Sequence, residues 1–310
     1  MNINDPDFFP KFDIKNQVVG QVGHGYIGQA VDELFKPHCQ VLVSDKAKPH
    51  LQTLSSVVKN ADIIFVAVPT PMNQDGSCHT GIVESVLQDI QNTALQESRE
   101  LDDFIVVIKS TVPPGFTQRM NDRFALRIVF SPEFLTEKSS VKDFKTASRL
   151  ILGGHIDDAS VVYKFFESVW IDRIPENYVS HPDGPVTILN CSSTSAEATK
   201  YFTNCYLSTV VTFANEFALL CEKLGVEYDQ VKTLALLDTR LSPSHLDVPG
   251  HDGKRGFGGS CFPKDVSSIR HVAKELGTGE KLFTAVVERN EEVRGGRDWE
   301  ELKGRAVVEK

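Results

Sequence analysis

The fold is decided by the stretch Val18-Val19-Gly20-Gln21-Val22-Gly23-His24-Gly25-Tyr26-Ile27-Gly28. A short apolar run ends at Val22, three glycines follow with the spacing G-x-G-x-x-G, and apolar residues then recur at helical spacing up to Leu34. This order predicts a strand, a tight turn and an amphipathic helix, which is the context in which the glycine spacing binds a dinucleotide.

Each glycine of the turn has its own predicted task. Gly23 permits the tight turn, Gly25 lets backbone amides approach a pyrophosphate, and Gly28 allows the helix to pack closely on the strand. The helix N-terminus, at Tyr26 and Ile27, supplies the positive end of the helix dipole for the phosphates. The pattern therefore predicts that these five residues bind a dinucleotide.

An acidic residue follows the second apolar run. Asp45 comes directly after Val41–Ser44 and about 20 residues beyond the turn, where a carboxylate can bind both hydroxyls of a ribose. Because a carboxylate repels a 2′-phosphate, the sequence favours NAD over NADP as the cofactor. The neighbouring Lys46 and Lys48 work against that preference.

Short apolar runs and helical stretches continue to alternate up to about residue 170. The alternation predicts an α/β fold with a Rossmann-type, doubly wound parallel sheet that helices cover on both faces. The predicted strands are Val18–Val22, Val41–Ser44, Asp62–Val68, Phe104–Lys109, Arg127–Phe130 and Leu150–Leu152, and further predicted helices are Leu51–Asn60, Gly81–Leu95 and Asp157–Trp170.

One long helix is predicted after Pro185, where the texture of the sequence changes. Residues 195–224 hold no helix breaker, the hydroxyls of Ser192–Ser195 can cap the N-terminus, and Gly225 can close the helix in a left-handed conformation. Its apolar residues go most of the way round, so the helix must be buried on several sides. A partner subunit is the natural cover, and we expect a homodimer through helix 195–224.

These patterns divide the chain into three segments. We expect an NAD-binding Rossmann-type domain with an N-terminal arm over residues 1–188. A smaller all-helical domain for dimerisation and catalysis, built on the long helix, follows over residues 189–290. Residues 291–310 are predicted to form a C-terminal tail.

The composition excludes several classes of protein. Among the 310 residues, 33 lysines and arginines stand against 42 acids, a net charge of −9 that disfavours a nucleic-acid partner. No apolar run is long enough to span a bilayer and the N-terminus lacks a signal-peptide pattern, so we expect no membrane association. The six cysteines form no CxxC pair and the nine histidines show no ligand spacing, which predicts a cytoplasmic protein with reduced thiols and no metal site.

The most informative stretch is Gly256-Phe257-Gly258-Gly259-Ser260-Cys261-Phe262-Pro263-Lys264-Asp265. Pro263 fits the first turn of a helix, and apolar residues recur at helical spacing after it. Cys261 is therefore expected at a helix N-terminus with Lys264 one turn away, two features that lower the pKa of a thiol. The stretch predicts a reactive cysteine next to a loop whose glycines let backbone amides approach a ligand.

This cysteine loop, together with the glycine turn, resembles the UDP-glucose/GDP-mannose dehydrogenase family. The resemblance runs from about residue 20 to residue 285, and the further motifs occur in the family's order. They are Val68-Pro69-Thr70-Pro71, Lys109-Ser110-Thr111-Val112-Pro113, Ser131-Pro132-Glu133-Phe134-Leu135-Thr136-Glu137, and Glu197-Ala198-Thr199-Lys200 followed by Asn204.

The resemblance implies an oxidoreductase of polysaccharide biosynthesis that converts the primary alcohol of a nucleotide sugar to a carboxylate. The leading reaction takes UDP-glucose, two NAD⁺ and water to UDP-glucuronate and two NADH. Cys261 would add to the intermediate aldehyde as a thiohemiacetal, and the second oxidation would leave a thioester that water hydrolyses.

The shared motifs also imply roles for single residues. Lys200 and Asn204, which share one helix face at i and i+4, would stabilise the alkoxide and the later oxyanions. Asp265 would act as base, Thr111 would hold the catalytic water, and Glu133 would support hydrolysis. The implied substrate contacts are Glu133, Phe134, Leu135, Glu137, Lys200, Asn204, Arg240, Phe257 and Gly258, and the implied cofactor contacts are Gly23, Gly25, Tyr26, Ile27, Gly28, Asp45, Thr70, Thr111 and Lys264.

Two features bear on the partner and on the substrate. Asp238-Thr239-Arg240-Leu241 resembles a segment whose arginine reaches the sugar site of the neighbouring subunit, which again indicates a dimer. The chain stops at residues 303–310, where the family's third, nucleotide-binding domain would begin. It therefore resembles either a short form that binds the nucleotide differently or a piece of a split enzyme, and the nucleotide and the sugar that it binds stay open.

Other functions fit parts of the sequence. GDP-mannose or a UDP-hexosamine could replace UDP-glucose as substrate. A two-electron hydroxyacid dehydrogenase could use Lys200 and Asn204 but would leave the Cys261 loop unexplained. A non-catalytic NAD-binding or dimerisation module is the third alternative, and the intact set of Cys261, Lys200, Asn204, Thr111 and Asp265 weighs against it.

Overall fold

A computed structural model describes residues 12–174 and 184–309, so the predicted N-terminal arm lies almost wholly outside the described residues. The chain divides into two compact units. Unit 1 comprises Met1–Pro69 and Thr80–Lys200, and unit 2 comprises Thr70–His79 and Tyr201–Lys310. The three predicted domain segments stay a prediction, and the division adds that segment 70–79 belongs with the second unit.

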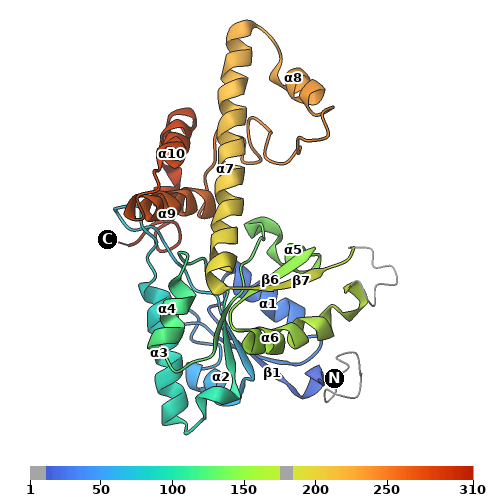
Figure 1. The fold of residues 1–310 in the computed structure, drawn as a ribbon, viewed down its shortest axis with the longest axis vertical. Helices are drawn as coiled ribbons and strands as arrows, with labels where there is room; N and C mark the ends of the chain where they lie inside the picture. The colour runs from blue at the N-terminus through green and yellow to red at the C-terminus, as the bar shows by residue number, and fades with distance from the viewer. Residues whose placement is uncertain (1–11, 175–183, 310) are drawn as a thin grey trace. The chain divides into compact units, whose positions relative to one another are not determined.

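Unit 1 is built on a seven-stranded sheet with the strand order β2-β1-β3-β4-β5-β6-β7 (Figure 1). The first five strands are parallel, and their order is one of the two common doubly wound orders, in which the winding reverses beside β1. All six predicted strands are present. The strands are β1 (Val18–Val22), β2 (Gln40–Ser44), β3 (Ile63–Val66), β4 (Ile105–Ile108), β5 (Ile128–Phe130), β6 (Arg149–Gly153) and β7 (Thr187–Cys191).

The sheet departs from the predicted parallel pattern at β6. Phe130 of β5 pairs antiparallel with Gly153 of β6, whereas β6 and β7 pair in parallel. The segment between β5 and β6 forms a 3-10 turn (Glu137–Ser139) and the short helix α5 (Ser140–Lys145), which packs on α1 (Tyr26–Phe35). The chain therefore re-enters the sheet from the edge at which β5 ends, and β6 runs back along β5.

Two apolar layers cover the two faces of this sheet. Ile64, Val66, Val106 and Ile108 face a layer formed by α2, α3 and α4. The alternate residues of the same strands face a layer formed by α1, α5 and α6. The remaining helices of these layers are α2 (Leu54–Asn60), α3 (Gly81–Gln96), α4 (Phe116–Arg123) and α6 (Ile156–Val169).

The predicted long helix is α7 (Ser193–Leu224), which begins in unit 1 and continues into unit 2 without interruption (Figure 1). The Ser192 hydroxyl accepts a hydrogen bond from the Ser195 amide at 3.1 Å, and Gly225 has a φ of +72°. Both predicted end signals are thus confirmed, because a side-chain oxygen caps the first turn and a left-handed glycine follows the last one.

The regular secondary structure in the rest of unit 2 is mainly helical. Its small core joins Cys205 of α7 to Phe257, Val266 and Val286. Segment 70–79 lies beside the C-terminal residues, because the Met72 backbone bonds with the backbones of residues 306 and 308. The helices after α7 are α8 (Tyr228–Ala235), α9 (Cys261–Glu275) and α10 (Lys281–Arg294), and α9 packs on α10.

Candidate active site

The glycine turn lies at the carboxyl end of β1, at the position where the winding of the sheet reverses. Gly23 has a φ of +85°, and a Cβ there would lie 2.4 Å from the Ala67 carbonyl oxygen. A Cβ on Gly28 would lie 2.1 Å from the Gly23 carbonyl oxygen. These two glycines are therefore required by the packing of the turn itself.

Gly25 differs from the other two glycines. It precedes the first turn of α1 with a φ of −75°, which any residue can adopt, and a Cβ there would meet no atom within 4 Å. The turn is thus open beside Gly25, where the amides of Tyr26 and Ile27 begin the helix. An open turn at a helix N-terminus fits the pyrophosphate of a dinucleotide.

Asp45 connects the end of β2 to the same turn. Its Oδ2 accepts a hydrogen bond from the His24 amide at 2.6 Å, and its Oδ1 accepts one from the Ala47 amide at 2.8 Å. Lys48 donates to the His24 carbonyl oxygen at 2.6 Å. A carboxylate has about four lone-pair positions, so Asp45 can also accept hydrogen bonds from the hydroxyls of a ribose. The arrangement of Asp45 beside the glycine turn therefore fits NAD.

Glu133 and Lys200 form a buried ion pair in unit 1. Lys200 Nζ donates to Glu133 Oε1 at 2.9 Å, and the two side chains are 5% and 2% exposed respectively. The second oxygen, Glu133 Oε2, accepts a hydrogen bond from the Leu135 amide at 2.6 Å. The structure thus joins two predicted catalytic residues that lie far apart in the sequence.

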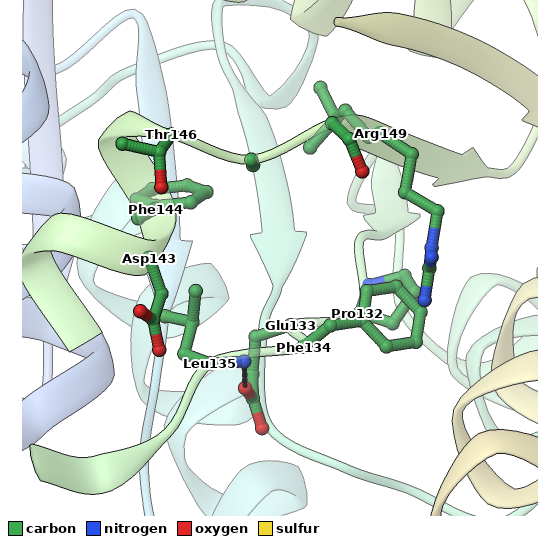
Figure 2. A pocket seen from close by; sticks show the side chains of 11 residues that line it. Pro132, Glu133, Phe134, Leu135, Asp143, Phe144, Thr146 and Arg149 are labelled. Atoms are coloured by element: carbon green, nitrogen blue, oxygen red, sulfur yellow. Dashed lines mark hydrogen bonds between the residues drawn. The ribbon is translucent and has the colours of Figure 1, made fainter. Parts of the chain in front are cut away.

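A cavity of about 280 Å³ opens beside this pair, between the segment after β5 and the segment that leads into β6 (Figure 2). Glu133, Phe134 and Leu135 line one side of it, and Arg149 lies over the Phe134 ring at 4.3 Å from the ring centroid. Three predicted substrate residues therefore line one cavity. Glu137, the fourth predicted substrate residue of this motif, is exposed.

Thr111 is buried in the loop that follows β4. Glu197 of α7 holds the far end of this loop, because its carboxylate accepts hydrogen bonds from the amides of Gly115 at 2.5 Å and Thr117 at 2.7 Å. Burial raises the pKa of Glu197, although the bonds from Thr117 and Gly115 oppose the rise. The sequence contained Glu197 in a motif but did not reveal this task.

Asp265 is the centre of the predicted site in unit 2. The Asn204 amide donates to Asp265 Oδ2 at 2.5 Å, Lys264 Nζ donates to Oδ1 at 2.5 Å, and Asp265 is 1% exposed. Burial alone would lower the pKa of Lys264. Negative charge on Asp265, Cys261 and Cys78 outweighs burial and raises that pKa above its usual range.

Cys261 is the first residue of α9, as predicted, and its side chain is partly exposed. Its Sγ lies 3.8 Å from the Ser260 hydroxyl oxygen. Since Cys261 acts on Lys264 electrostatically, the lysine charge acts equally on the thiol. The thiol thus lies at a helix N-terminus beside a cation, the setting in which cysteines react as nucleophiles.

Two asparagines that were not predicted hold the cysteine loop. Asn290 of α10 accepts from the Phe257 amide at 2.7 Å and donates to the Phe257 carbonyl oxygen at 2.9 Å, and Asn215 of α7 accepts from the Gly256 amide at 3.0 Å. Both asparagines are 1% exposed. Buried amides that pair with loop backbone fix the loop, and no local pattern in the sequence marks them.

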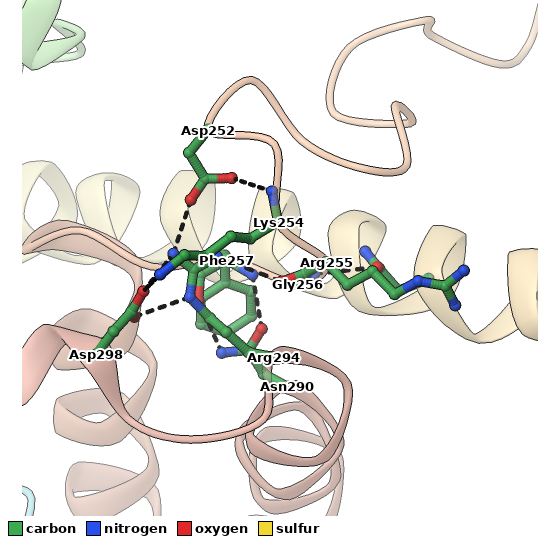
Figure 3. A network of polar contacts seen from close by, with 9 residues as sticks. Asp252, Lys254, Arg255, Gly256, Phe257, Asn290, Arg294 and Asp298 are labelled. Carbon is green, nitrogen blue, oxygen red and sulfur yellow. Dashed lines mark hydrogen bonds and ion pairs between the residues drawn. The ribbon is translucent and has the colours of Figure 1, made fainter.

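Arg294 of α10 completes this network (Figure 3). It bonds Asp252 at 2.7 Å and Asp298 at 2.7 and 2.8 Å, and its side chain is 4% exposed. A Cβ on Gly258 would lie 2.2 Å from Arg294 Nη2. The loop therefore needs glycine at this position because an immobilised guanidinium lies against it.

The predicted residues fall into two groups. Thr111, Glu133, Phe134, Leu135 and Lys200 belong to unit 1, with the glycine turn and Asp45. Thr70, Asn204, Phe257, Gly258, Cys261, Lys264 and Asp265 belong to unit 2. Arg240 also belongs to unit 2, where it is exposed after α8 and pairs with Asp238 at 2.5 Å.

Two domain models of one protein family match the chain. Residues 44–170 match the NAD binding domain of the UDP-glucose/GDP-mannose dehydrogenase family, and residues 194–292 match the central domain of the same family. The chain belongs to this family. The predicted family, the Rossmann-type fold class and NAD as the cofactor of the family's NAD binding domain are thereby confirmed.

Individual proteins named UDP-glucose 6-dehydrogenase are also similar to this chain in sequence. UDP-glucose 6-dehydrogenase TuaD of Bacillus subtilis is 29% identical over 261 residues, which are 81% of this chain and 51% of the relative. UDP-glucose 6-dehydrogenase of Pseudomonas aeruginosa is 30% identical over 272 residues, 83% of this chain and 55% of the relative. The chain spans about half the length of these relatives.

A solved structure of the family shares the fold. The UDP-glucose dehydrogenase of Pyrobaculum islandicum superposes with a TM-score of 0.75 at 26% identity, over 92% of this chain and 70% of that chain.

Among the described residues, no helix is long and apolar enough to cross a membrane.

Proposed function

We propose that the chain carries out the NAD-dependent oxidation of a nucleotide sugar, UDP-glucose in the first place, from primary alcohol to carboxylate. The observation that carries the proposal is Cys261 at the N-terminus of α9, beside Lys264 and the buried Asp265. A hydroxyl oxidation that ends at the aldehyde needs no nucleophile. A reactive cysteine supplies a covalent route that takes the aldehyde on to the acid.

The glycine turn and Asp45 would hold NAD. The open space at Gly25 and the amides of Tyr26 and Ile27 fit the pyrophosphate, and the Asp45 carboxylate fits the ribose hydroxyls. Thr70, Thr111 and Lys264 are the further cofactor contacts that we propose. NAD, when bound, accepts the hydride in each of the two oxidations.

In the first oxidation Asp265 would remove the proton of the sugar hydroxyl. The bonds from Lys264 and Asn204 hold the Asp265 carboxylate in one orientation. Asn204 has a second amide proton, and Lys200 has an ammonium that its bond to Glu133 holds in place. These two donors would stabilise the negative charge that develops on the sugar oxygen.

The second oxidation would proceed on Cys261. Its sulfur bonds to the aldehyde carbon while the aldehyde oxygen takes up the thiol proton, which forms a thiohemiacetal. Loss of a hydride from that carbon, with release of the hydroxyl proton to water, leaves a thioester. Water held by the Thr111 hydroxyl then attacks the carbonyl carbon while Glu133 accepts its proton. The C–S bond breaks, and the products are the carboxylate and the Cys261 thiol.

The substrate side of the site is proposed from the cavity residues. Phe134 and Leu135 line the cavity in unit 1, and Glu137, Phe257 and Gly258 are the further contacts proposed for the nucleotide sugar. The names of the curated relatives favour UDP-glucose over GDP-mannose or a UDP-hexosamine.

A homodimer through α7 is part of the proposal. Aromatic side chains on α7 are strongly exposed, among them Phe202 at 74% and Phe213 at 61%, and such a row of apolar side chains marks an interaction surface. Arg240 would contact the substrate of the partner subunit. Because the cysteine must stay reduced, we propose a reducing compartment such as the cytoplasm.

The proposal is tested by comparing two cysteine variants of the full chain. Wild-type protein, Cys261→Ala and Cys39→Ala are incubated with NAD⁺ and UDP-glucose, and the uronate is measured by mass spectrometry. Burial raises the pKa of Cys39 to about 11, so this thiol serves as a control that is poorly suited to nucleophilic attack. We expect uronate from wild type and Cys39→Ala but none from Cys261→Ala, and equal uronate from all three would contradict the covalent step.

A further inference from the structure

Lys109 is a motif residue to which the proposed function gives no task. It follows β4 in Lys109-Ser110-Thr111-Val112-Pro113, and it lies on the sheet face of Ile105 and Val107. Its side chain is almost completely buried, with 1% of the residue exposed. A lysine is rarely buried to this degree unless its charge is compensated or lost.

The hydrogen bonds of Lys109 suit a neutral amine. Lys109 Nζ donates to the Ser131 hydroxyl at 3.1 Å and to the Pro132 carbonyl oxygen at 3.3 Å. The Phe144 ring centroid lies 5.1 Å from the same nitrogen. A neutral amine has two N–H donors, and two oxygen acceptors are present here; an ammonium has a third N–H, for which the Phe144 ring offers a π contact.

The charges nearby also favour the loss of one proton. Lys109 adjoins the Glu133–Lys200 ion pair, so that two amino groups and one carboxylate are buried together in unit 1. Burial lowers the pKa of Lys109 to about 7; Glu133 opposes the shift and Lys200 adds to it. One carboxylate compensates one ammonium, and Lys200 bonds to it directly.

Charged side chains on the other elements of this layer are engaged elsewhere. Asp143 of α5 accepts hydrogen bonds from Thr136, and Arg149 of β6 lies over the Phe134 ring. On α1, Asp32 pairs with His24 and Glu33 pairs with Lys36, and Lys145 of α5 acts electrostatically on Glu33. Asp158 of α6 pairs with Arg127. Glu133 and Lys200 are therefore the charges that govern Lys109.

We propose that Lys109 is a positioning residue that releases its proton so that Lys200 stays the single ammonium beside Glu133. This inference rests on the proposed function, because Lys200 can stabilise an oxyanion only while it carries its proton. It predicts an unusual order of effects for substitutions of Lys109. A permanent cation at position 109 should harm the site more than no cation, since it repels the proton of Lys200.

The proton states can be read directly by NMR of the full chain labelled with ¹³C and ¹⁵N lysine. The Lys109 signal is the one missing from Lys109→Met, and the Lys200 signal is assigned in the same way with Lys200→Met. We expect Lys109 to titrate near neutral pH while Lys200 stays protonated. In Lys109→Arg, Lys200 should lose its proton at a lower pH than in Lys109→Met.

Turnover gives the second readout. Above neutral pH we expect Lys109→Arg to lose about tenfold or more in kcat, which corresponds to one pKa unit of lost stabilisation. Below neutral pH, where wild-type Lys109 is itself charged, the kcat values of Lys109→Arg and wild type should converge. Lys109→Met should keep most of kcat above neutral pH, and Lys145→Arg, at an exposed position of α5, controls for the exchange of lysine for arginine.

The outcomes separate this inference from the proposed function. Absence of turnover in wild type contradicts the proposed function, while the NMR titration still decides the proton state of Lys109. The inference is overturned if Lys109 stays protonated up to the ordinary lysine range of about pH 10. It is also overturned if Lys200 titrates identically in Lys109→Arg and Lys109→Met.

Discussion

Asn204 donates its side-chain amide to Asp265 across 2.5 Å, and both side chains are almost completely buried. The bond ties α7 to α9, the helix that begins with Cys261. Lys264 occupies the second oxygen of the same carboxylate. A buried carboxylate held by two donors has a fixed orientation, which a general base requires.

Removal of this amide should cost stability as well as activity. Asn204→Ala leaves Asp265 Oδ2 without its partner, and we expect a loss of about 1.5–3 kcal/mol in the free energy of unfolding. Urea unfolding measures the loss. The matched control is Asn60→Ala, because Asn60 makes its bond to the Ser56 carbonyl at the exposed end of α2. Equal losses in the two variants would contradict the structural importance of the Asn204–Asp265 bond.

The glycine turn allows cofactor binding and folding to be tested separately. A methyl group on Gly25 projects into open space, so Gly25→Ala should keep the free energy of unfolding within about 0.5 kcal/mol and weaken NAD binding. Gly28→Ala forces a Cβ against the Gly23 carbonyl oxygen and should cost about 1–3 kcal/mol. Urea unfolding and calorimetric titration with NAD provide the two readouts. Wild-type NAD affinity in Gly25→Ala would remove the turn from the cofactor site.

Lys109 predicts a pH dependence of stability. Its pKa is about 7 in the folded protein and about 10.4 in an unfolded chain. Between these values the unfolded chain binds the extra proton, so the free energy of unfolding rises with pH. The free energy of unfolding of wild type minus that of Lys109→Met should therefore increase from about pH 7 to about pH 10. A difference that is constant or falls over this range would show that folding does not lower this pKa.

The exposed aromatic face of α7 predicts the oligomeric state. Phe213→Glu places a charge on this face and should convert a dimer to monomers in analytical ultracentrifugation. Leu95→Glu is the matched control, because Leu95 is 60% exposed on α3 of unit 1, and it should leave the dimer intact. A monomeric wild-type protein, or a dimer that tolerates Phe213→Glu, would contradict the proposed interface.

Much of the fold could be predicted because buried parallel strands need continuous apolar runs. Ile63–Val66 and Ile105–Ile108 are buried at every residue, and both are predicted from the sequence. Strand β7 (Thr187–Cys191) was missed because it lies at the sheet edge and is half exposed, so it carries no such run. The antiparallel direction of β6 depends on where α5 packs, which no local pattern reports.

The candidate site was predictable only where chemistry leaves a local pattern. Cys261 and Lys264 are close in sequence, and their place on a helix N-terminus follows from Pro263. The Asn290 bonds to Phe257 join residues 33 positions apart, and an asparagine within a helix looks the same whether it faces water or a loop. Long-range polar contacts of this kind require the folded structure.

The most direct measurement is the amount of NADH that the purified chain releases from a limiting amount of UDP-glucose in excess NAD⁺, followed to completion. Oxidation of an alcohol to a carboxylate through the Cys261 thioester predicts two NADH per sugar. One NADH per sugar would contradict the account and indicate a two-electron dehydrogenase. No NADH from UDP-glucose, GDP-mannose or a UDP-hexosamine, with NAD still bound, would contradict it in favour of a non-catalytic module.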